Sequence, residues 1–226
     1  MRKLTFPVLF VLLAACTKEV NSDLTVPVNG GEQSDAIIDT YLPLTAGTYW
    51  DYSLQTDNQA PGKSKLTVLS VHKNFDGKKY TAVQSIRGKY NADTLYYNQT
   101  QHSYYIYTNE GTSNSDAVKV QILFLKDNAS VGDTWSQSAG SANGQTLTCY
   151  GQIKEKNISV TVNGVTFDHV IHTYIEIRKP ILFFYVVVYK QNYYVAKNIG
   201  IIKNISNQLQ PSNSTTTSTI INYAIK

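Results

Sequence analysis

The 226-residue chain has little charge and no concentration of positive charge. Lys and Arg number 20 against 16 Asp and Glu, which leaves a formal net charge of +4. No run exceeds two adjacent basic residues. Without a basic patch there is no electrostatic reason to expect a nucleic-acid partner. The hydrophobic fraction of 42% excludes a wholly disordered chain and fits one globular domain.

Signature motifs of enzymes and metal proteins are also missing. Phosphate-binding loops, zinc-protease helices, paired-cysteine clusters, nucleophile elbows and calcium loops have recognisable spacings, and none occurs. His169 and His172 are three residues apart in a predicted strand, so their side chains should lie on opposite faces and cannot easily share a metal. We predict no cofactor, no metal and no catalytic residue, and we expect a protein that is not an enzyme.

One catalytic alternative stays open because it leaves no sequence motif. A glycan hydrolase needs two carboxyl groups held about 5 to 10 Å apart, and this separation is visible only in space. Asp51, Asp133 and Glu176 are the carboxylates to measure for a glycan or ester hydrolase. Their ordinary interpretation is a solvated sheet face or a turn cap.

Tyrosine is the abundant residue, with 17 copies. Together with Val, Ile and Thr it favours strands, because branched and aromatic side chains fit a pleated surface. Alternating segments such as 48–54 recur at short spacings, which favours antiparallel neighbours. About ten to twelve short strands are expected. We predict an all-β fold with a single curved antiparallel sheet, a half-barrel, and keep a two-sheet sandwich as the alternative.

Two segments give sharper expectations. Ile158–Phe167 predicts a β-hairpin, because Asn163-Gly164 supplies the two positive φ angles of a type I′ turn. The apolar run Ile181–Tyr189 is too short to span a bilayer and too apolar for a strand wetted on one side. It predicts a central strand.

The first residues predict export. Arg2 and Lys3 precede an apolar stretch that ends in Leu13-Ala14-Ala15-Cys16, which is typical of a bacterial lipobox. We predict a signal peptide over 1–15, a lipidated Cys16 with a flexible tether over 16–36, and a β domain over 37–226. Two acyl chains on Cys16 would give stable membrane attachment. An ordinary signal peptide with a coincidental cysteine is the alternative. Cys149, the other cysteine, is expected to be a buried, inert thiol.

Four stretches resemble a family of uncharacterised outer-membrane lipoproteins from Bacteroidetes-type bacteria. They are Tyr41–Tyr52 (YLPLTAGTYWDY), Val131–Trp135 (VGDTW), Val162–Phe167 (VNGVTF) and Tyr193–Lys203 (YYVAKNIGIIK). Asn198 departs mildly from the glycine expected there. The resemblance implies a curved antiparallel sheet like that of periplasmic lipoprotein carriers, and no established activity. It also implies an outer-membrane location, with the periplasmic or surface face left open.

The function expected is a lipid-anchored, non-catalytic binding or accessory module. Its partners would be the membrane, through the lipid, and an apolar or amphiphilic ligand, a glycan or an envelope protein. Exposed Tyr and Trp side chains would serve a glycan, although paired tyrosines also strengthen sheets by themselves. The candidate ligand-binding residues are Trp50, Tyr52, Tyr97, Tyr105, Trp135 and Phe184.

Overall fold

The computed structural model describes residues 32–33, 39–88, 91–110, 118–142, 144–210 and 213–226. The predicted signal peptide, Cys16 and most of the predicted tether lie outside these ranges. Within them, no helix has the length and apolar content needed to cross a membrane. The described residues form strands and the turns between them, as the tyrosine-rich composition predicts.

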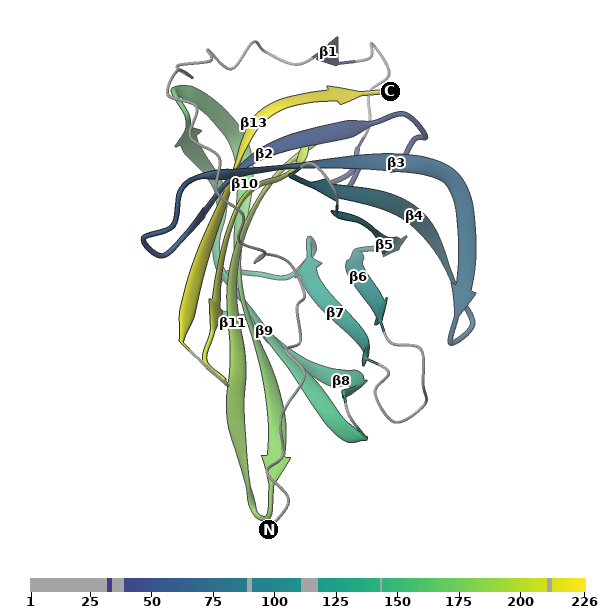
Figure 1. Cartoon of the computed structure of the whole chain (residues 1–226), viewed down its shortest axis with the longest axis vertical. Helices are drawn as coiled ribbons and strands as arrows, with labels where there is room; N and C mark the ends of the chain where they lie inside the picture. Colours follow the sequence, from purple (N-terminus) through teal and green to yellow (C-terminus); the bar gives the residue numbers. More distant parts are fainter. Residues whose placement is uncertain (1–31, 34–38, 89–90, 111–117, 143, 211–212) are drawn as a thin grey trace.

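Twelve strands follow one another in an antiparallel meander (Figure 1). A thirteenth, the short β1 (Glu32–Gln33), pairs in parallel with the end of the last strand. The twelve are β2 (Tyr49–Thr56), β3 (Gly62–Phe75), β4 (Lys78–Arg87), β5 (Asn91–Thr100), β6 (Ser103–Glu110), β7 (Val118–Lys126), β8 (Thr134–Ala142), β9 (Gln145–Val162), β10 (Val165–Ile181), β11 (Phe184–Ala196), β12 (Gly200–Gln208) and β13 (Ser214–Ile225).

The sheet closes on itself, so the expectation of an open half-barrel is wrong, and so is the sandwich alternative. Strand β13 pairs with β12 on one edge and with β2 on the other, for example Ile220 with Tyr52 and Tyr223 with Trp50. Closure gives the first and last long strands a partner each and removes two free sheet edges. The candidate ligand space is therefore the inside of a barrel rather than an open concave face.

The barrel wall is weakest between β7 and β8. These strands pair only through Val118–Val120 and Gly140–Ala142. Further along β7, side chains replace the missing ladder. The Leu123 carbonyl accepts a hydrogen bond from Trp135 Nε1 at 3.1 Å, and the Phe124 carbonyl accepts one from Thr173 Oγ1 at 2.7 Å. Side chains of β8 and β10 thus satisfy these two buried carbonyl groups of β7.

Cys149 is another side chain that contacts a β7 carbonyl beside the short β7–β8 pairing. Its side chain is fully buried, with Sγ 3.8 Å from the Leu123 carbonyl oxygen. Burial raises the pKa of the thiol to about 12, and a backbone hydrogen bond from Leu123 opposes this rise only in part. The thiol therefore stays protonated at neutral pH, and the prediction of a buried cysteine is confirmed.

The Asn163-Gly164 hairpin is confirmed. Strand β9 ends at Val162 and β10 begins at Val165, and the two turn residues have φ angles of 49° and 84°. The prediction for Ile181–Tyr189 is wrong. This run contains a turn at Leu182 and Phe183 that joins β10 to β11, and the side chains there are exposed instead of central.

Tyrosines are buried on both faces of the wall. Tyr97 lines the interior, and its neighbour Tyr96 faces outward but is only 8% exposed. Phe75, near the end of the long strand β3, covers this outer side and stacks on Tyr107 with ring centroids 4.3 Å apart. Tyr80 lies in the same cluster and is fully buried. These four aromatic side chains thus form a second, small core outside the barrel.

These buried phenols predict unfolding in alkali. Burial raises the pKa of Tyr80 to about 12, although its hydrogen bond from Gln121 lowers it in part, and burial raises the pKa of Tyr52 and Tyr193 well above the ordinary value. Above pH ~10 the unfolded chain releases protons that the folded chain retains, so stability falls as pH rises. Each group contributes up to about 1.4 kcal/mol per pH unit.

The stabilising effect is complete below pH ~10 and is lost as the pH rises through the folded pKa values. Urea unfolding followed by circular dichroism between pH 7 and 12, alongside tyrosinate absorbance, measures it. We expect part of the tyrosinate signal to appear only with unfolding. Ionisation of all 17 tyrosines near pH ~10 with an unchanged sheet signal would contradict the prediction.

Candidate functional site: a cavity inside the barrel

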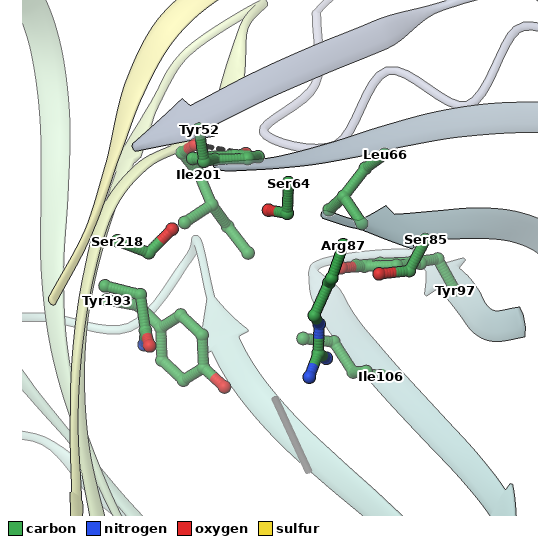
Figure 2. Close-up of a pocket in the computed structure, with 11 residues that line it drawn as sticks. Tyr52, Ser64, Leu66, Ser85, Arg87, Tyr97, Ile106, Tyr193, Ile201 and Ser218 are labelled. Carbon is green, nitrogen blue, oxygen red and sulfur yellow. Dashed lines mark hydrogen bonds between the residues drawn. The ribbon is translucent and has the colours of Figure 1, made fainter. Parts of the chain in front are cut away.

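A small cavity lies inside the barrel between β2, β3 and β4 on one side and β12 and β13 on the other (Figure 2). Its volume is about 40 Å³, enough for a few water molecules. The cavity is lined by side chains of eight strands, namely Tyr52, Ser64, Leu66, Ser85, Arg87, Tyr97, Ile106, Tyr193, Ile201, Asn204 and Ser218.

Strand β4 contributes the two most informative groups. Because strand side chains alternate, Val83, Ser85 and Arg87 share the inner face. Ser85 is 1% exposed, and its Oγ has no hydrogen-bond partner. An unpartnered buried hydroxyl costs about 1 to 3 kcal/mol. Ser85 Oγ is therefore a hydrogen-bonding group at the cavity wall that has no partner among the protein atoms.

Arg87 brings a positive charge to the same space. Its side chain descends into the cavity toward Ile106, between the rings of Tyr193 and Tyr97 (Figure 2). Burial raises the pKa of Tyr97, and the nearby Arg87 charge opposes this rise, which places the guanidinium within electrostatic reach of the phenol. A guanidinium can form strong, charge-assisted hydrogen bonds to an anionic group.

The rest of the cavity wall is mostly apolar, and the tyrosine hydroxyl groups of Tyr52 and Tyr193 are hydrogen-bonded within the protein. Tyr52 donates its hydroxyl proton to the Ile201 carbonyl at 2.7 Å, and Tyr193 donates to the Gln191 side chain. Burial raises the pKa of both phenols, so they remain neutral. With their hydroxyl groups engaged, these tyrosines present ring faces to the cavity. The cavity combines one cation and a few hydroxyl groups with aromatic and aliphatic walls.

Of the six residues predicted to bind a ligand, the structure brings two together at the cavity, Tyr52 and Tyr97. Trp50 lies beside them on β2, but it is 3% exposed and donates Nε1 to the Ile199 carbonyl at 2.6 Å. Its ring packs close to Gly200. Trp50 therefore fastens β2 to the β11–β12 turn.

The other three predicted residues are scattered. Trp135 seals the gap between β7 and β8. Tyr105 is on the outer side of the wall, with the Lys78 ammonium 4.2 Å from its ring centre. Phe184 is 57% exposed at the start of β11. An alternating pattern identifies buried aromatic residues, but it does not say which of them border empty space.

The carboxylates considered for hydrolysis have separate structural partners. Asp51 accepts a hydrogen bond from the Asn222 amide at 3.3 Å, and Asp133 caps the turn before β8 by accepting from the Ser130 backbone at 2.8 Å. Glu176 pairs with Arg178 at 2.6 Å. Burial alone would raise the pKa of Glu176, but hydrogen bonds from Tyr174 and Arg178 outweigh it and lower that pKa.

The histidines also have separate neighbours. His169 Nδ1 lies 2.6 Å from the Asn157 amide oxygen, and His172 Nδ1 lies 2.7 Å from a Glu155 carboxylate oxygen. His169 has a positive φ of 53° beside a register shift in β10, which breaks the alternation assumed from the sequence. Over the ranges that the structure describes, no three His, Cys, Asp or Glu side chains gather as metal ligands would.

Sequence inspection missed Arg87 and Ser85. A usable signal existed, because Ser85 and Arg87 continue the alternation of Val83 on the inner face. The strand-like pattern in the sequence covers Tyr80–Ile86 and stops one residue short of Arg87. A charged residue at the inward position of a strand end is the feature that could have identified it.

Comparison with known proteins finds similar solved structures but no match in sequence. No family model matches the chain, and no curated protein matches it. Three solved structures are similar in shape. A Bacteroides fragilis protein described as exported and of YmcC-like fold has a TM-score of 0.48 and 8% identity, and the similarity covers 80% of this chain and 97% of that one.

The second is a Parabacteroides distasonis protein described as a lipoprotein, with a TM-score of 0.46, 11% identity, and coverage of 81% and 97%. The third is a LolA superfamily protein from Nitrosomonas europaea, with a TM-score of 0.32, 9% identity, and coverage of 82% and 88%. The three are described as an exported protein, a lipoprotein and a LolA superfamily protein, in line with the resemblance noted in the sequence.

Proposed function

We propose that this protein is a lipid-anchored, non-catalytic binding module of the bacterial outer membrane, and that its barrel takes up a small anionic amphiphile. The observation that carries the proposal is the cavity in which Arg87 and the unpartnered Ser85 hydroxyl face apolar walls. The head group of such a ligand would accept hydrogen bonds from the guanidinium and from Ser85. Its tail would lie against Leu66, Ile106 and Ile201.

The size of the cavity restricts the ligand. About 40 Å³ is far below the roughly 300 to 1,000 Å³ of a pocket for a drug-sized molecule. Uptake of an acyl chain therefore requires interior side chains to change rotamer. The short β7–β8 pairing is the place where the wall can open with the loss of few ladder hydrogen bonds, since only three residue pairs join these strands.

Binding of decanoate and of decanol to the non-acylated mature chain, measured by calorimetry and native mass spectrometry, tests this proposal. We expect decanoate to bind more tightly than the alcohol. Arg87→Met removes the charge and keeps the length of the side chain, so it should weaken decanoate binding about tenfold or more and leave decanol unchanged, since a charged hydrogen bond is worth roughly 1.5 to 3 kcal/mol.

Two further variants complete the test. Ile106→Phe should reduce the binding of both probes, because it fills the cavity. Lys119→Met removes an exposed positive charge from a neighbouring part of the barrel and should change neither affinity. Equal affinities for decanoate and decanol, or an Arg87→Met variant that binds decanoate normally, would count against the proposal.

Glycan binding has less support. A shallow groove at the β7–β8 connection contains Trp135 with Lys126, Asn128 and Asp133. However, Trp135 is only 7% exposed, so little of its ring is available to stack on a sugar, and Asp133 is occupied as a turn cap.

A further inference from the structure

The β10–β11 hairpin ends in the largest exposed apolar feature of the described chain. Leu182 is 88%, Phe183 100%, Phe184 57% and Tyr185 61% exposed. We call these four residues the hairpin tip. Consecutive exposed side chains of this size form a patch of the kind that marks contact with a partner or a membrane.

The tip extends beyond the rest of the barrel (Figure 1). Pairing of β10 with β9 ends at Arg178, and pairing of β11 with β12 starts at Tyr189. Between these points β10 and β11 pair only with each other, from Lys179–Val186 to Ile181–Phe184. At about 3.3 Å per residue, the hairpin projects roughly 13 Å past its neighbours.

The turn itself is poorly suited to folding. A two-residue hairpin turn favours Asn-Gly, which this chain uses at Asn163-Gly164. At the tip the turn is Leu182-Phe183, and Leu182 has a positive φ of 52° that an apolar side chain rarely adopts. Strained residues persist where function requires them. The hairpin's own folding does not account for apolar side chains at this turn.

Charge around the tip identifies the contact surface. Residues 177–226 contain six Lys or Arg and no Asp or Glu. Three of the six, Arg178, Lys179 and Lys190, bracket the tip in sequence. Glu176 forms an ion pair with Arg178 and lies opposite Lys190 on the neighbouring strand, so a net positive charge remains. An aromatic tip with cations set behind it matches a bilayer, whose apolar boundary lies beneath anionic headgroups.

We infer that the hairpin tip inserts into the interface of a lipid bilayer that carries anionic headgroups. The depth agrees, because interfacial segments bury their apolar side chains about 5 to 10 Å. Deeper entry is disfavoured, since the free edges of a two-stranded hairpin would leave backbone groups unsatisfied in hydrocarbon. The tip would orient a barrel that the predicted lipid on Cys16 only tethers.

Depth-dependent quenching of a tryptophan tests the inference in the lipid-anchored full chain. Phe183→Trp is reconstituted into vesicles of phosphatidylcholine and phosphatidylglycerol, with and without brominated acyl chains. We expect the emission that this variant adds to the wild type to be lost to bromine and to be protected from aqueous iodide. Trp50 and Trp135 are 3% and 7% exposed inside the barrel and supply a constant background.

Val131→Trp is the matched control, because Val131 is 60% exposed on the β7–β8 connection, away from the hairpin. Its added emission should be quenched by iodide and not by bromine. Flotation of each sample with vesicles verifies the anchor independently. If Phe183→Trp behaves like Val131→Trp, or is protected from both quenchers because protein covers it, the inference is overturned.

A second variant tests the reason for the apolar turn. Leu182→Asn with Phe183→Gly installs the turn sequence of the other hairpin, and it should leave the thermal midpoint unchanged or higher. With Tyr185→Trp as the reporter in both backgrounds, bromine quenching should be lost in the variant tip. A lower thermal midpoint would mean that the tip serves the fold, and quenching that persists would mean that apolar turn residues are not needed; either result overturns the inference.

Discussion

Replacing Gly151 by alanine is expected to be among the most destabilising single-methyl additions in this protein. Gly151 pairs with Trp135 across β8 and β9. A Cβ atom at position 151 would lie 2.1 to 2.4 Å from three atoms of the indole ring. The backbone there is ordinary extended strand, so the effect is one of space rather than of φ. Trp135 must leave its site.

The displaced indole loses both burial and its hydrogen bond to the Leu123 carbonyl. Loss of a buried tryptophan costs about 3 to 5 kcal/mol, and we expect Gly151→Ala to approach this range in urea unfolding. Gly62→Ala is the matched control, because the nearest atom to its new Cβ is 3.8 Å away, an ordinary contact. It should change stability little.

A double-mutant cycle separates the steric cause from others. Trp135→Ala removes the obstruction, so in that background Gly151→Ala should have almost no further effect. If Gly151→Ala is too unstable to purify, the doubly substituted chain should regain the solubility of Trp135→Ala alone. Additive losses in the two variants would show that the glycine matters for a reason other than the indole.

The local parts of this fold could be predicted from sequence. Alternation and turn chemistry identify the strands and the Asn163-Gly164 hairpin, because both depend on neighbours in the chain. Closure of the barrel could not be predicted. It depends on pairing between Tyr52 and Ile220, which are far apart in sequence, and alternation describes a strand's faces but not its partner.

The run Ile181–Tyr189 shows where hydrophobicity misleads. An apolar segment is buried inside the fold only when other parts of the same chain cover it. A segment that contacts a partner can be equally apolar and still be exposed in the fold. Pro180 carried a usable signal, because proline lacks an N–H group and is confined to strand edges. In the structure it pairs with Tyr185, at a point where β9 no longer runs beside β10.

Only some of the residues at the candidate site could be predicted from the sequence. Tyr52 could be assigned to the interior because it alternates with the polar residues Asp51 and Ser53. The pair Tyr96-Tyr97 places one ring on each face of a strand, but the sequence does not say that Tyr97 is the inner one. Whether Trp50 or Trp135 borders a cavity depends on packing with distant residues such as Gly200 and Gly151. Arg87 is the opposite case, since a charged side chain is the last residue that a hydrophobic pattern would assign to an interior.

Substituting Cys16 by serine is expected to move the protein from the membrane to the soluble fraction. The predicted anchor is diacylglycerol on the Cys16 thiol, and serine offers no thiol to modify. Each buried methylene contributes about 0.8 kcal/mol, so loss of two acyl chains removes far more attraction than any surface contact supplies. The variant should be expressed behind a signal peptide that is cut in the ordinary way, so that no apolar leader remains.

Membrane fractionation and intact-mass spectrometry together measure where the protein lies and whether it carries the lipid. The wild type should pellet with membranes and have a mass that lacks residues 1–15 and includes the lipid. Cys149→Ala is the control, because it removes the other cysteine, which is buried, and should leave both readouts unchanged. An unmodified, uncleaved wild-type amino terminus would refute the anchor.

The soluble Cys16→Ser protein also separates the anchor from the hairpin tip. It retains Leu182 to Tyr185, whose four side chains are exposed but bury little surface compared with two acyl chains. Even a single myristoyl chain binds membranes only marginally, so the tip alone should give weak, salt-sensitive binding to anionic vesicles. Tight retention of Cys16→Ser would mean that the tip or another surface anchors the protein, and that the lipid only supplements it.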